Sequence, residues 1–244
     1  MKPAPLLVVR PEPGNAVTLA AARALGLEAH GDPLFEIVPV AWTPPPPAKF
    51  DAVLIGSANV LRHGGEALAR YATLPAYVVG QTTAEVASQA GFAVAAVGSG
   101  GLQALTARLA ADGCRRVLRL AGAEHVPLTV SPDTAIVTVV VYEARPLPLS
   151  AASAVLLRDD TVVMLHSAAA ARYFAEECKR MTIARASIAL ACLGSRIAAA
   201  AGAGRSDRGW ASVASAQHPD DTALLALAAQ MCQNEAFGDT DNKS

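Results

Sequence analysis

Short, continuous apolar runs alternate along this chain with longer runs in which apolar residues recur at helical spacing. The short runs are typical of strands buried on both faces, and the longer runs are typical of amphipathic helices. Strands that alternate with helices favour parallel sheets covered on both faces. The pattern predicts an α/β protein with strands at 6–9, 35–40, 51–55, 76–79, 93–97, 117–120, 135–142, 161–165, 188–192 and 211–214, and helices at 16–25, 58–71, 82–90, 102–112, 168–180, 195–201 and 222–233.

Part of this pattern occurs twice in the chain. The strand and helix start at 51–58 resemble those at 161–168, and those at 77–84 resemble those at 191–198. A further correspondence is permuted, because the first strand resembles the strand at 117–120. Two similar lobes therefore exist, and the chain begins in one lobe, crosses to the other and returns.

Two proline-rich segments, 40–47 and 143–148, mark the expected crossings. Two crossings make a double hinge, and we expect a cleft between the lobes, where ligand sites are common. The expected organisation is a discontinuous lobe one at 1–40 and 147–235, a lobe two at 41–146, and a flexible C-terminal tail at 236–244.

Each repeated motif places Ser, Thr or Gly where a predicted strand ends and a helix starts. Ligands of open α/β sheets bind beyond the carboxyl ends of the strands, and free N–H groups at helix starts attract anions. Any one such residue is better explained as an ordinary N-cap or tight turn. Their recurrence in both lobes favours an anion site formed by Ser57, Ala58, Gly80, Thr83, Gly100, Gly101 and Gly122 in lobe two, and by Arg10, Ser167, Ala168 and Gly194 in lobe one.

Composition changes this picture little. The 244 residues are 52% apolar and 17% charged, which excludes a disordered chain. A formal net charge of −1 predicts neither a nucleic-acid binder nor a polybasic membrane binder, so an anionic ligand needs local donors. The chain has no apolar stretch long enough to predict a membrane-spanning helix and no secretory signal pattern at its start, and we expect a cytoplasmic protein.

Motifs for other chemistry are missing from the sequence. Four scattered cysteines form no C-x-x-C pair, which predicts buried, reduced thiols, and five histidines lack zinc-site spacing. There is no phosphate-binding loop and no G-x-S-x-G elbow of a hydrolase. The adjacent His166 and Ser167 would point to opposite faces of a strand, which argues against a Ser–His dyad.

Several short motifs, taken in order, resemble the uroporphyrinogen-III synthase family over about residues 4–233. They are Arg10-Pro11, Phe50 to Asn59, Val79 to Ala84, Gly91-Phe92, Leu118 to Gly122, Val139 to Glu143, and His166 to Ala168. The resemblance implies two flavodoxin-like lobes with parallel sheets, joined by a two-stranded connector. It also implies a monomer without a cofactor, acting in tetrapyrrole biosynthesis, and leaves open a transient contact with the deaminase that supplies its substrate.

The resemblance also implies a reaction. The family closes the linear tetrapyrrole hydroxymethylbilane to a macrocycle, with inversion of the last pyrrole ring and loss of water. The substrate's several carboxylates match the anion site expected from the helix starts. Tyr142 matches the family tyrosine that assists departure of the hydroxyl, because a neutral phenol can donate a hydrogen bond to it. Arg10 could pair with a carboxylate or be an ordinary surface arginine.

The sequence departs from the family pattern at two places. Ile197 follows Gly194 where many members have threonine, and segment 122–134 lacks a helical pattern.

Two other classes of protein stay open. One is a bilobal α/β protein that binds a small polyanion without catalysis, and the other is a nucleotide-using α/β enzyme, which the missing phosphate-binding loop disfavours.

Overall fold

A computed structural model describes residues 3–99, 101–202 and 209–233. The chain forms two compact units, unit 1 from residues 1–36 and 146–244 and unit 2 from residues 37–145. It leaves unit 1 within strand β3 (Phe35–Pro39) and returns at the end of β8 (Ala135–Pro146), and these two strands are neighbours in one sheet. The sequence analysis places the same crossings at 40/41 and 146/147, and its tail at 236–244 lies outside the described residues.

Unit 1 contains a five-stranded sheet in the order β11-β10-β9-β1-β2, with parallel pairing throughout. Its three central strands are apolar and completely buried, as expected where both faces of a parallel sheet are covered. Its strands are β1 (Leu6–Val8), β2 (Ala29–Gly31), β9 (Thr161–Leu165), β10 (Ile188–Cys192) and β11 (Ser212–Ser215), and its helices are α1 (Gly14–Ala24), α5 (Ala151–Leu156), α6 (Ala168–Arg180), α7 (Ser195–Ala200) and α8 (Asp221–Gln233).

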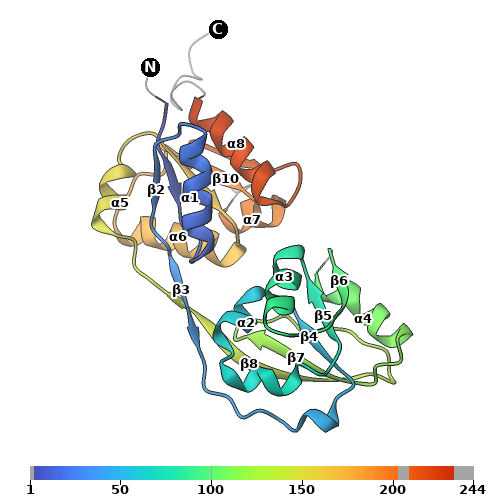
Figure 1. Ribbon diagram of the computed structural model, residues 1–244. Coiled ribbons are helices and arrows are strands. Elements are labelled where there is room, and N and C mark those ends of the chain that lie inside the picture. The colour runs from blue at the N-terminus through green and yellow to red at the C-terminus, as the bar shows by residue number, and fades with distance from the viewer. Residues whose placement is uncertain (1–2, 100, 203–208, 234–244) are drawn as a thin grey trace. The chain divides into compact units, whose positions relative to one another are not determined.

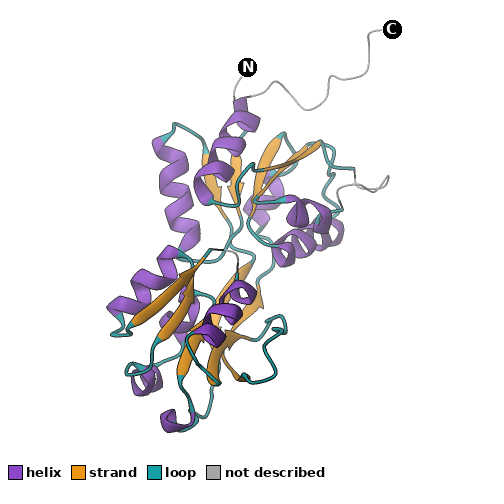
Figure 2. Ribbon diagram, turned by 90° about the vertical axis from the view of Figure 1, so that its right-hand side faces the viewer, coloured by secondary structure: helices purple, strands orange, loops and turns teal. Residues whose placement is uncertain are grey.

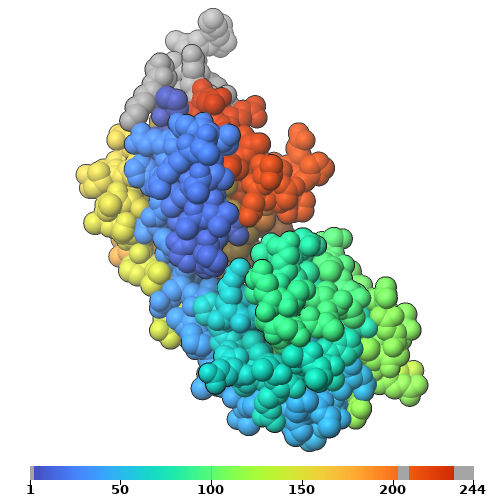
Figure 3. Space-filling view, in the orientation of Figure 1, coloured from blue at the N-terminus to red at the C-terminus, as the bar shows by residue number. Residues whose placement is uncertain are grey.

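Helices cover both faces of this sheet (Figure 2). On one face, α6 packs Phe174 and Cys178, which are four residues apart and so share one side of the helix, into a core with β9 and β10. On the other face, α1 and α8 lie side by side (Figures 1 and 3) and pack Ala22 and Leu224 against the sheet. These two cores hold the carboxyl ends of the central strands in place.

Unit 2 contains a six-stranded sheet in the order β3-β8-β7-β4-β5-β6, in which the pairs from β8 to β6 are parallel. One face packs against α2, η2 and α3, and the other against α4 and part of segment 123–134. Its further strands are β4 (Ala52–Ile55), β5 (Ala76–Val79), β6 (Val94–Gly98) and β7 (Arg116–Gly122), and its helices are η1 (Pro47–Lys49), α2 (Ala58–His63), η2 (Glu66–Tyr71), α3 (Gln81–Gln89) and α4 (Leu102–Ala111).

The permuted repeat is visible in the order of the strands. In the sheet of unit 1, the consecutive strands β9, β10 and β11 lie on one side of the sheet's middle and β1 and β2 lie on the other. In the sheet of unit 2, β4, β5 and β6 lie on one side, and β7 and β8 lie on the other. The strand β1 of unit 1 thus corresponds to β7 of unit 2, as the sequence predicts. The α/β class with two parallel sheets is confirmed.

One predicted helix is wrong. The expected helix at 58–71 is divided into α2 and the 3₁₀ helix η2 by Gly64 and Gly65. Gly65 has φ +73°, a conformation that favours glycine, and a Cβ at Gly64 would lie 2.7 Å from the carbonyl oxygen of Val60. The chain therefore turns here instead of continuing the helix.

Other differences concern short or extended elements. The sequence analysis missed β2, α5 and η1, which have three to six residues each and are too short for a periodic pattern. It also ended two strands early, because β8 runs on to Pro146 and β7 runs on to Gly122. Gly122 therefore lies at the end of a strand and does not form a turn of its own.

The four cysteines are buried and unpaired, as predicted. Burial raises the pKa of the Cys178 and Cys192 thiols to about 12, so both stay protonated and unreactive at neutral pH. Within the described ranges, no helix has the length and apolar character needed to cross a membrane. The same ranges contain no group of three or more His, Cys, Asp or Glu side chains suited to hold a metal ion.

Candidate functional site

The connectivity of each sheet reverses direction at one point, and some of the predicted site residues lie there. In unit 2 the reversal lies between neighbouring strands β4 and β7, and in unit 1 it lies between neighbouring strands β9 and β1. Loops that leave the carboxyl ends of two such strands go to opposite faces and leave a crevice between them, where ligands of α/β proteins bind. Each unit therefore offers one candidate site.

The unit 2 site is a pocket of about 210 Å³ at the ends of β4 and β7. This volume is below the 300–1,000 Å³ typical of pockets for a whole drug-sized ligand. The pocket brings together three of the predicted residues, Ser57, Gly122 and Tyr142, and adds others that the sequence analysis did not select. The complete lining is Gly56, Ser57, Val60, Leu102, Arg119, Leu120, Ala121, Gly122, Glu124, His125, Val126 and Tyr142.

Tyr142 reaches this pocket because of an irregularity in the sheet. The register between β7 and β8 shifts after Ala121, so that Gly122 pairs with Tyr142. A β-bulge of this kind changes the direction of a side chain near a site. The phenol then lies directly over Gly122, where a Cβ would be 2.6 Å from the ring carbon Cζ and 2.9 Å from the hydroxyl oxygen. Glycine at 122 therefore makes the space for this ring.

The Tyr142 hydroxyl makes no hydrogen bond to any residue that the structure describes. One face of the ring approaches His63, with ring centroids 6.5 Å apart, and the remainder packs against the apolar core. Burial lowers the pKa of His63 below its ordinary value, and so does the charge of the neighbouring Arg62. Both effects favour the neutral form of the His63 ring that lies beside Tyr142.

Ser57 and the glycines of unit 2 adopt the roles expected at helix starts. The Ser57 Oγ caps α2 and accepts a hydrogen bond from the backbone N–H of Asn59, at 3.2 Å. Gly80 and Gly101 begin α3 and α4 with φ of +80° and +89°, which favours glycine. Ala58 is buried as the first residue of α2.

The pocket does not include all the predicted residues of unit 2. Ala58, Gly80, Thr83 and Gly101 do not line it. Thr83 is buried within α3, with 5% of the residue exposed. Gly100 lies outside the described residues.

Arg119 is the one cation that lines this pocket in the described part of unit 2. It is 3% exposed, in the middle of β7, although the residues on both sides of it are apolar. Its Nη1 donates a hydrogen bond of 2.7 Å to the carbonyl oxygen of Val126, and its buried Nε has no partner. Burial lowers the pKa of the guanidinium below its ordinary value, yet an arginine stays charged at neutral pH.

Segment 123–134 forms the outer wall of the pocket. It contains no helix, in agreement with the sequence analysis. His125 is exposed, and its Nδ1 lies 2.9 Å from the carbonyl oxygen of Gly122. The segment is also held by Gln103, which donates to the carbonyl oxygen of Thr129 and accepts from its N–H. These contacts fix the wall against β7 and α4.

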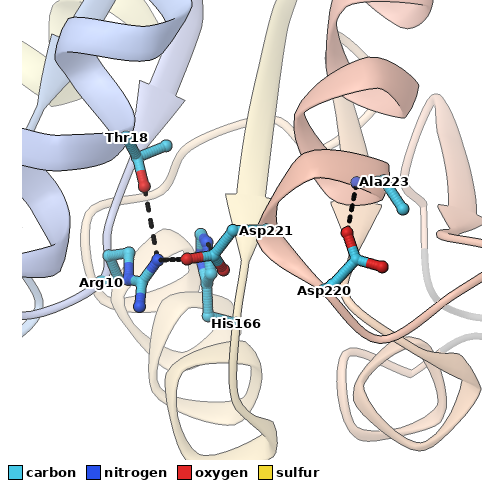
Figure 4. A network of polar contacts seen from close by, with 6 residues as sticks. All are labelled: Arg10, Thr18, His166, Asp220, Asp221 and Ala223. Carbon is cyan, nitrogen blue, oxygen red and sulfur yellow. Dashed lines mark hydrogen bonds and ion pairs between the residues drawn. The ribbon is translucent and has the colours of Figure 1, made fainter. Parts of the chain in front are cut away.

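The unit 1 site centres on Arg10, which follows β1 (Figure 4). Its Nη1 donates to Asp221 Oδ2 at 2.6 Å and lies 3.4 Å from Thr18 Oγ1. Asp221 is the first residue of α8, where a carboxylate is favoured by the helix dipole. The neighbouring Asp220 caps the same helix by accepting a hydrogen bond from the N–H of Ala223. In this structure Arg10 is thus already paired with an acidic side chain.

His166 lies beside this ion pair (Figure 4), directly after β9. Its side chain is 9% exposed, and neither ring nitrogen has a hydrogen-bond partner, while Nε2 is 3.7 Å from Asp221 Oδ1. Burial and the charge of Arg10 lower the pKa of His166 to about 4, against the opposing effect of Asp221. His166 is therefore neutral at pH 7.

The remaining predicted residues of unit 1 surround the same strand ends. The exposed Ser167 caps α6, and its Oγ accepts from the N–H of Ala170 at 3.1 Å. Ala168 is the first residue of that helix, and Gly194 directly precedes α7. A Cβ on Gly194 would meet no atom within 4 Å, so its backbone is open to approach. Ile197 is half-buried against the core.

Sequence reasoning did not select Arg119, His125, His166 or Asp221 as site residues. A signal existed for Arg119, because it is a charged residue inside the apolar run 117–121. The positions of His166 and Asp221 gave no such signal, because they are 55 residues apart and meet only through the fold.

Comparison with known proteins identifies the fold and the family. A family model described as uroporphyrinogen-III synthase HemD matches residues 16–226, which is most of the chain. A crystal structure of uroporphyrinogen-III synthetase from Helicobacter pylori 26695 is similar with a TM-score of 0.64 and 18% identity, over 95% of this chain and 100% of that one.

A mutant uroporphyrinogen III synthase from the extremely thermophilic bacterium Thermus thermophilus is similar with a TM-score of 0.52 and 17% identity, over 93% of this chain and 99% of that one. At these identities the two structures establish a shared fold. A search of curated protein sequences gave no significant match.

Proposed function

The chain belongs to the uroporphyrinogen-III synthase family, whose members are cyclising lyases of tetrapyrrole biosynthesis, and we propose that Tyr142 is the residue that assists loss of water in its reaction. The substrate in this proposal is hydroxymethylbilane, which the enzyme closes with inversion of the last pyrrole ring. The observation that carries the proposal is the position of the phenol. It lies over Gly122 in the unit 2 pocket, with its hydroxyl unbonded among the described residues.

The chemistry assigned to Tyr142 is hydrogen-bond donation. The bond between the substrate's terminal carbon and its hydroxyl breaks, and the departing oxygen takes up negative charge that a donor stabilises. The Tyr142 O–H can supply this hydrogen bond without ionising, because a phenol is neutral near pH 7. The cation left on the pyrrole chain is then attacked within the same molecule, and the proton released on ring closure combines with the departed hydroxide to give the water that is lost. The enzyme's further task is to hold the chain in a reactive conformer.

The substrate's carboxylates are assigned to the helix starts and to Arg10. In unit 2 the proposed contacts are Ser57, Ala58, Gly80, Thr83, Gly100, Gly101 and Gly122, and in unit 1 they are Arg10, Ser167, Ala168 and Gly194. The support is physical: helix starts carry free N–H groups and the positive end of the helix dipole. Of these, the buried Thr83 has the least accessible side chain.

The family chemistry also supports a proposal for the protein's setting. We propose that it acts as a monomer in the cytoplasm and takes up substrate during a transient contact with the deaminase that makes it. The physical reason is the instability of the linear tetrapyrrole, which cyclises spontaneously to the wrong isomer. A short path between the two enzymes would reduce that loss.

The test of the function uses the whole protein and freshly prepared hydroxymethylbilane. The products are oxidised and separated by chromatography, which resolves the type III isomer from the type I isomer. We expect type III to predominate with enzyme and type I in a control without enzyme. Type I alone in both samples would reject the synthase function for this chain.

A further inference from the structure

Arg119 is a buried charge that the described protein does not neutralise. It is 3% exposed, it has no ion pair among the described residues, and its Nε lies buried without a hydrogen-bond acceptor. Its one hydrogen-bond partner there is a neutral carbonyl oxygen, that of Val126. Because an unpaired buried charge is strongly unfavourable, proteins rarely keep one without a use for it.

The surroundings of Arg119 indicate what could neutralise it. It lines the same pocket as Ser57, Gly122 and Tyr142, at the reversal point of the unit 2 sheet. The pocket holds about 210 Å³, enough for one substituent of a larger ligand. A guanidinium presents parallel N–H donors that match the two oxygens of a carboxylate. A single carboxylate side arm fits the size of this space and can pair with Arg119, which makes no hydrogen bond or ion pair with Glu124, the acidic residue of the same lining.

We propose that Arg119 binds one carboxylate side arm of the substrate in the unit 2 pocket, beside Tyr142. This inference rests on the proposed function for the identity of the substrate, but its physical basis is the uncompensated cation. The Nε and the remaining guanidinium N–H groups would donate to the carboxylate, while Nη1 keeps its bond to Val126 and fixes the orientation of the fork. Arg119 would then contribute to substrate affinity, whereas Tyr142 contributes to the chemical step.

A purely structural role for Arg119 predicts the opposite effects of its replacement on melting temperature and on substrate affinity. If the residue only anchored segment 123–134 through Val126, its loss would lower the melting temperature and leave substrate affinity almost unchanged. If it binds a carboxylate, replacing it by an apolar side chain of similar length removes an unpaired buried charge. That change keeps or raises the melting temperature, while it weakens substrate binding.

The experiment compares Arg119→Met and Arg119→Lys with the wild-type enzyme. We expect Arg119→Met to raise KM for hydroxymethylbilane by about 10- to 100-fold, the value of a lost hydrogen-bonded charge pair. Its kcat should stay within about threefold, since uniform binding affects KM alone. Arg119→Lys keeps a cation but not the fork, and its KM should be intermediate. Arg115→Met, the same change at an exposed position before β7, is the matched control.

A second measurement does not depend on turnover. Sodium propionate should raise the melting temperature of the wild-type protein more than sodium chloride of equal ionic strength, and this difference should be clearly smaller in Arg119→Met. A wild-type KM in Arg119→Met, or an equal propionate effect in both proteins, would overturn the proposal. If the wild-type enzyme formed only the type I isomer, the proposed function would fail, and the propionate measurement would still decide the anion site.

Discussion

The sheets of the two units have corresponding strand orders, apart from the additional edge strand β3 in unit 2. The cations at their reversal points, however, have different partners. In unit 1, Arg10 is paired at 2.6 Å with Asp221, and a neutral His166 lies beside the pair. In unit 2, Arg119 is more deeply buried and has no acidic partner among the described residues. The comparison teaches that one scaffold can either pair a cation with an acidic side chain or leave it without one.

The residues that close each crevice account for this difference. In unit 1, the helix α8 brings an acidic residue to the strand ends at its own N-terminus. In unit 2, the non-helical segment 123–134 occupies the wall and supplies a backbone carbonyl instead. In unit 2 the bulge turns Tyr142 toward the crevice, and the missing Cβ of Gly122 makes room for its ring. We therefore expect the chemical step to depend on unit 2.

The largest expected effect tests the assignment of the chemical step to unit 2. Tyr142→Phe removes the proposed hydrogen-bond donor and should lower kcat by about 1,000-fold, or about 4 kcal/mol, as expected for loss of a donor to a developing negative charge. The ring is retained, so the melting temperature should hardly change. The measurement is steady-state formation of the type III isomer, and a kcat within about threefold of wild type would remove Tyr142 from the mechanism.

The second effect concerns His166 of unit 1, the neutral histidine that lies beside the Arg10–Asp221 pair. It tests how stability depends on pH. His166 has a folded-state pKa of about 4 against an ordinary value of 6.5, and Arg10 and Asp221 are the charged groups that face it. The unfolded chain therefore binds a proton between these pH values that the folded chain does not. The free energy of unfolding should fall by about 3 kcal/mol as the pH drops from 6.5 to 4.

The control for this pH effect is His166→Gln, which cannot gain the proton. Urea denaturation at several pH values should show a smaller loss of stability in the variant than in the wild type. Equal slopes for the two proteins would mean that other groups cause the acid sensitivity.

A smaller effect is expected from Gly122→Ala in unit 2. The new Cβ would lie 2.6 Å from the Tyr142 ring, which has to move, and we expect kcat to fall by about 10-fold, since small displacements of a reacting group are costly. In a Tyr142→Phe background the same substitution should cost much less, because the hydroxyl that it displaces is absent. Additive effects of the two changes would argue that Gly122 acts independently of Tyr142.

The smallest effect concerns the paired cation of unit 1. Asp221→Asn removes a carboxylate that competes with the substrate for Arg10, and we expect KM to fall by about two- to fivefold. That range corresponds to a partly exposed ion pair worth less than about 1 kcal/mol. KM of the variant and of the wild type is measured from initial rates over a range of substrate concentrations. A higher KM would instead indicate that Asp221 orients Arg10 for binding.

Much of the fold follows from local patterns in the sequence. The buried parallel strands, such as 161–165 and 188–192, are continuous apolar runs with the predicted ends, because both faces of the sheet exclude water. The permuted repeat predicts the matching strand orders of the two units. The elements missed, such as β2 and α5, are too short to show a period, and the helix expected at 58–71 is broken by the backbone requirements at Gly64–Gly65.

For the candidate site too, some features follow from the sequence and others only from the tertiary structure. By itself, the sequence determined that Ser57, Ser167 and Gly194 lie between a strand and a helix and that Gly122 lies near a strand end, and a family resemblance pointed to Tyr142. Tertiary structure alone decided which of them meet, that Tyr142 lies over Gly122, and that Asp221 satisfies Arg10 while Arg119 has no such partner among the described residues. The physical reason is that burial and ion pairing depend on segments far apart in the chain, whereas strand and helix patterns depend on neighbours.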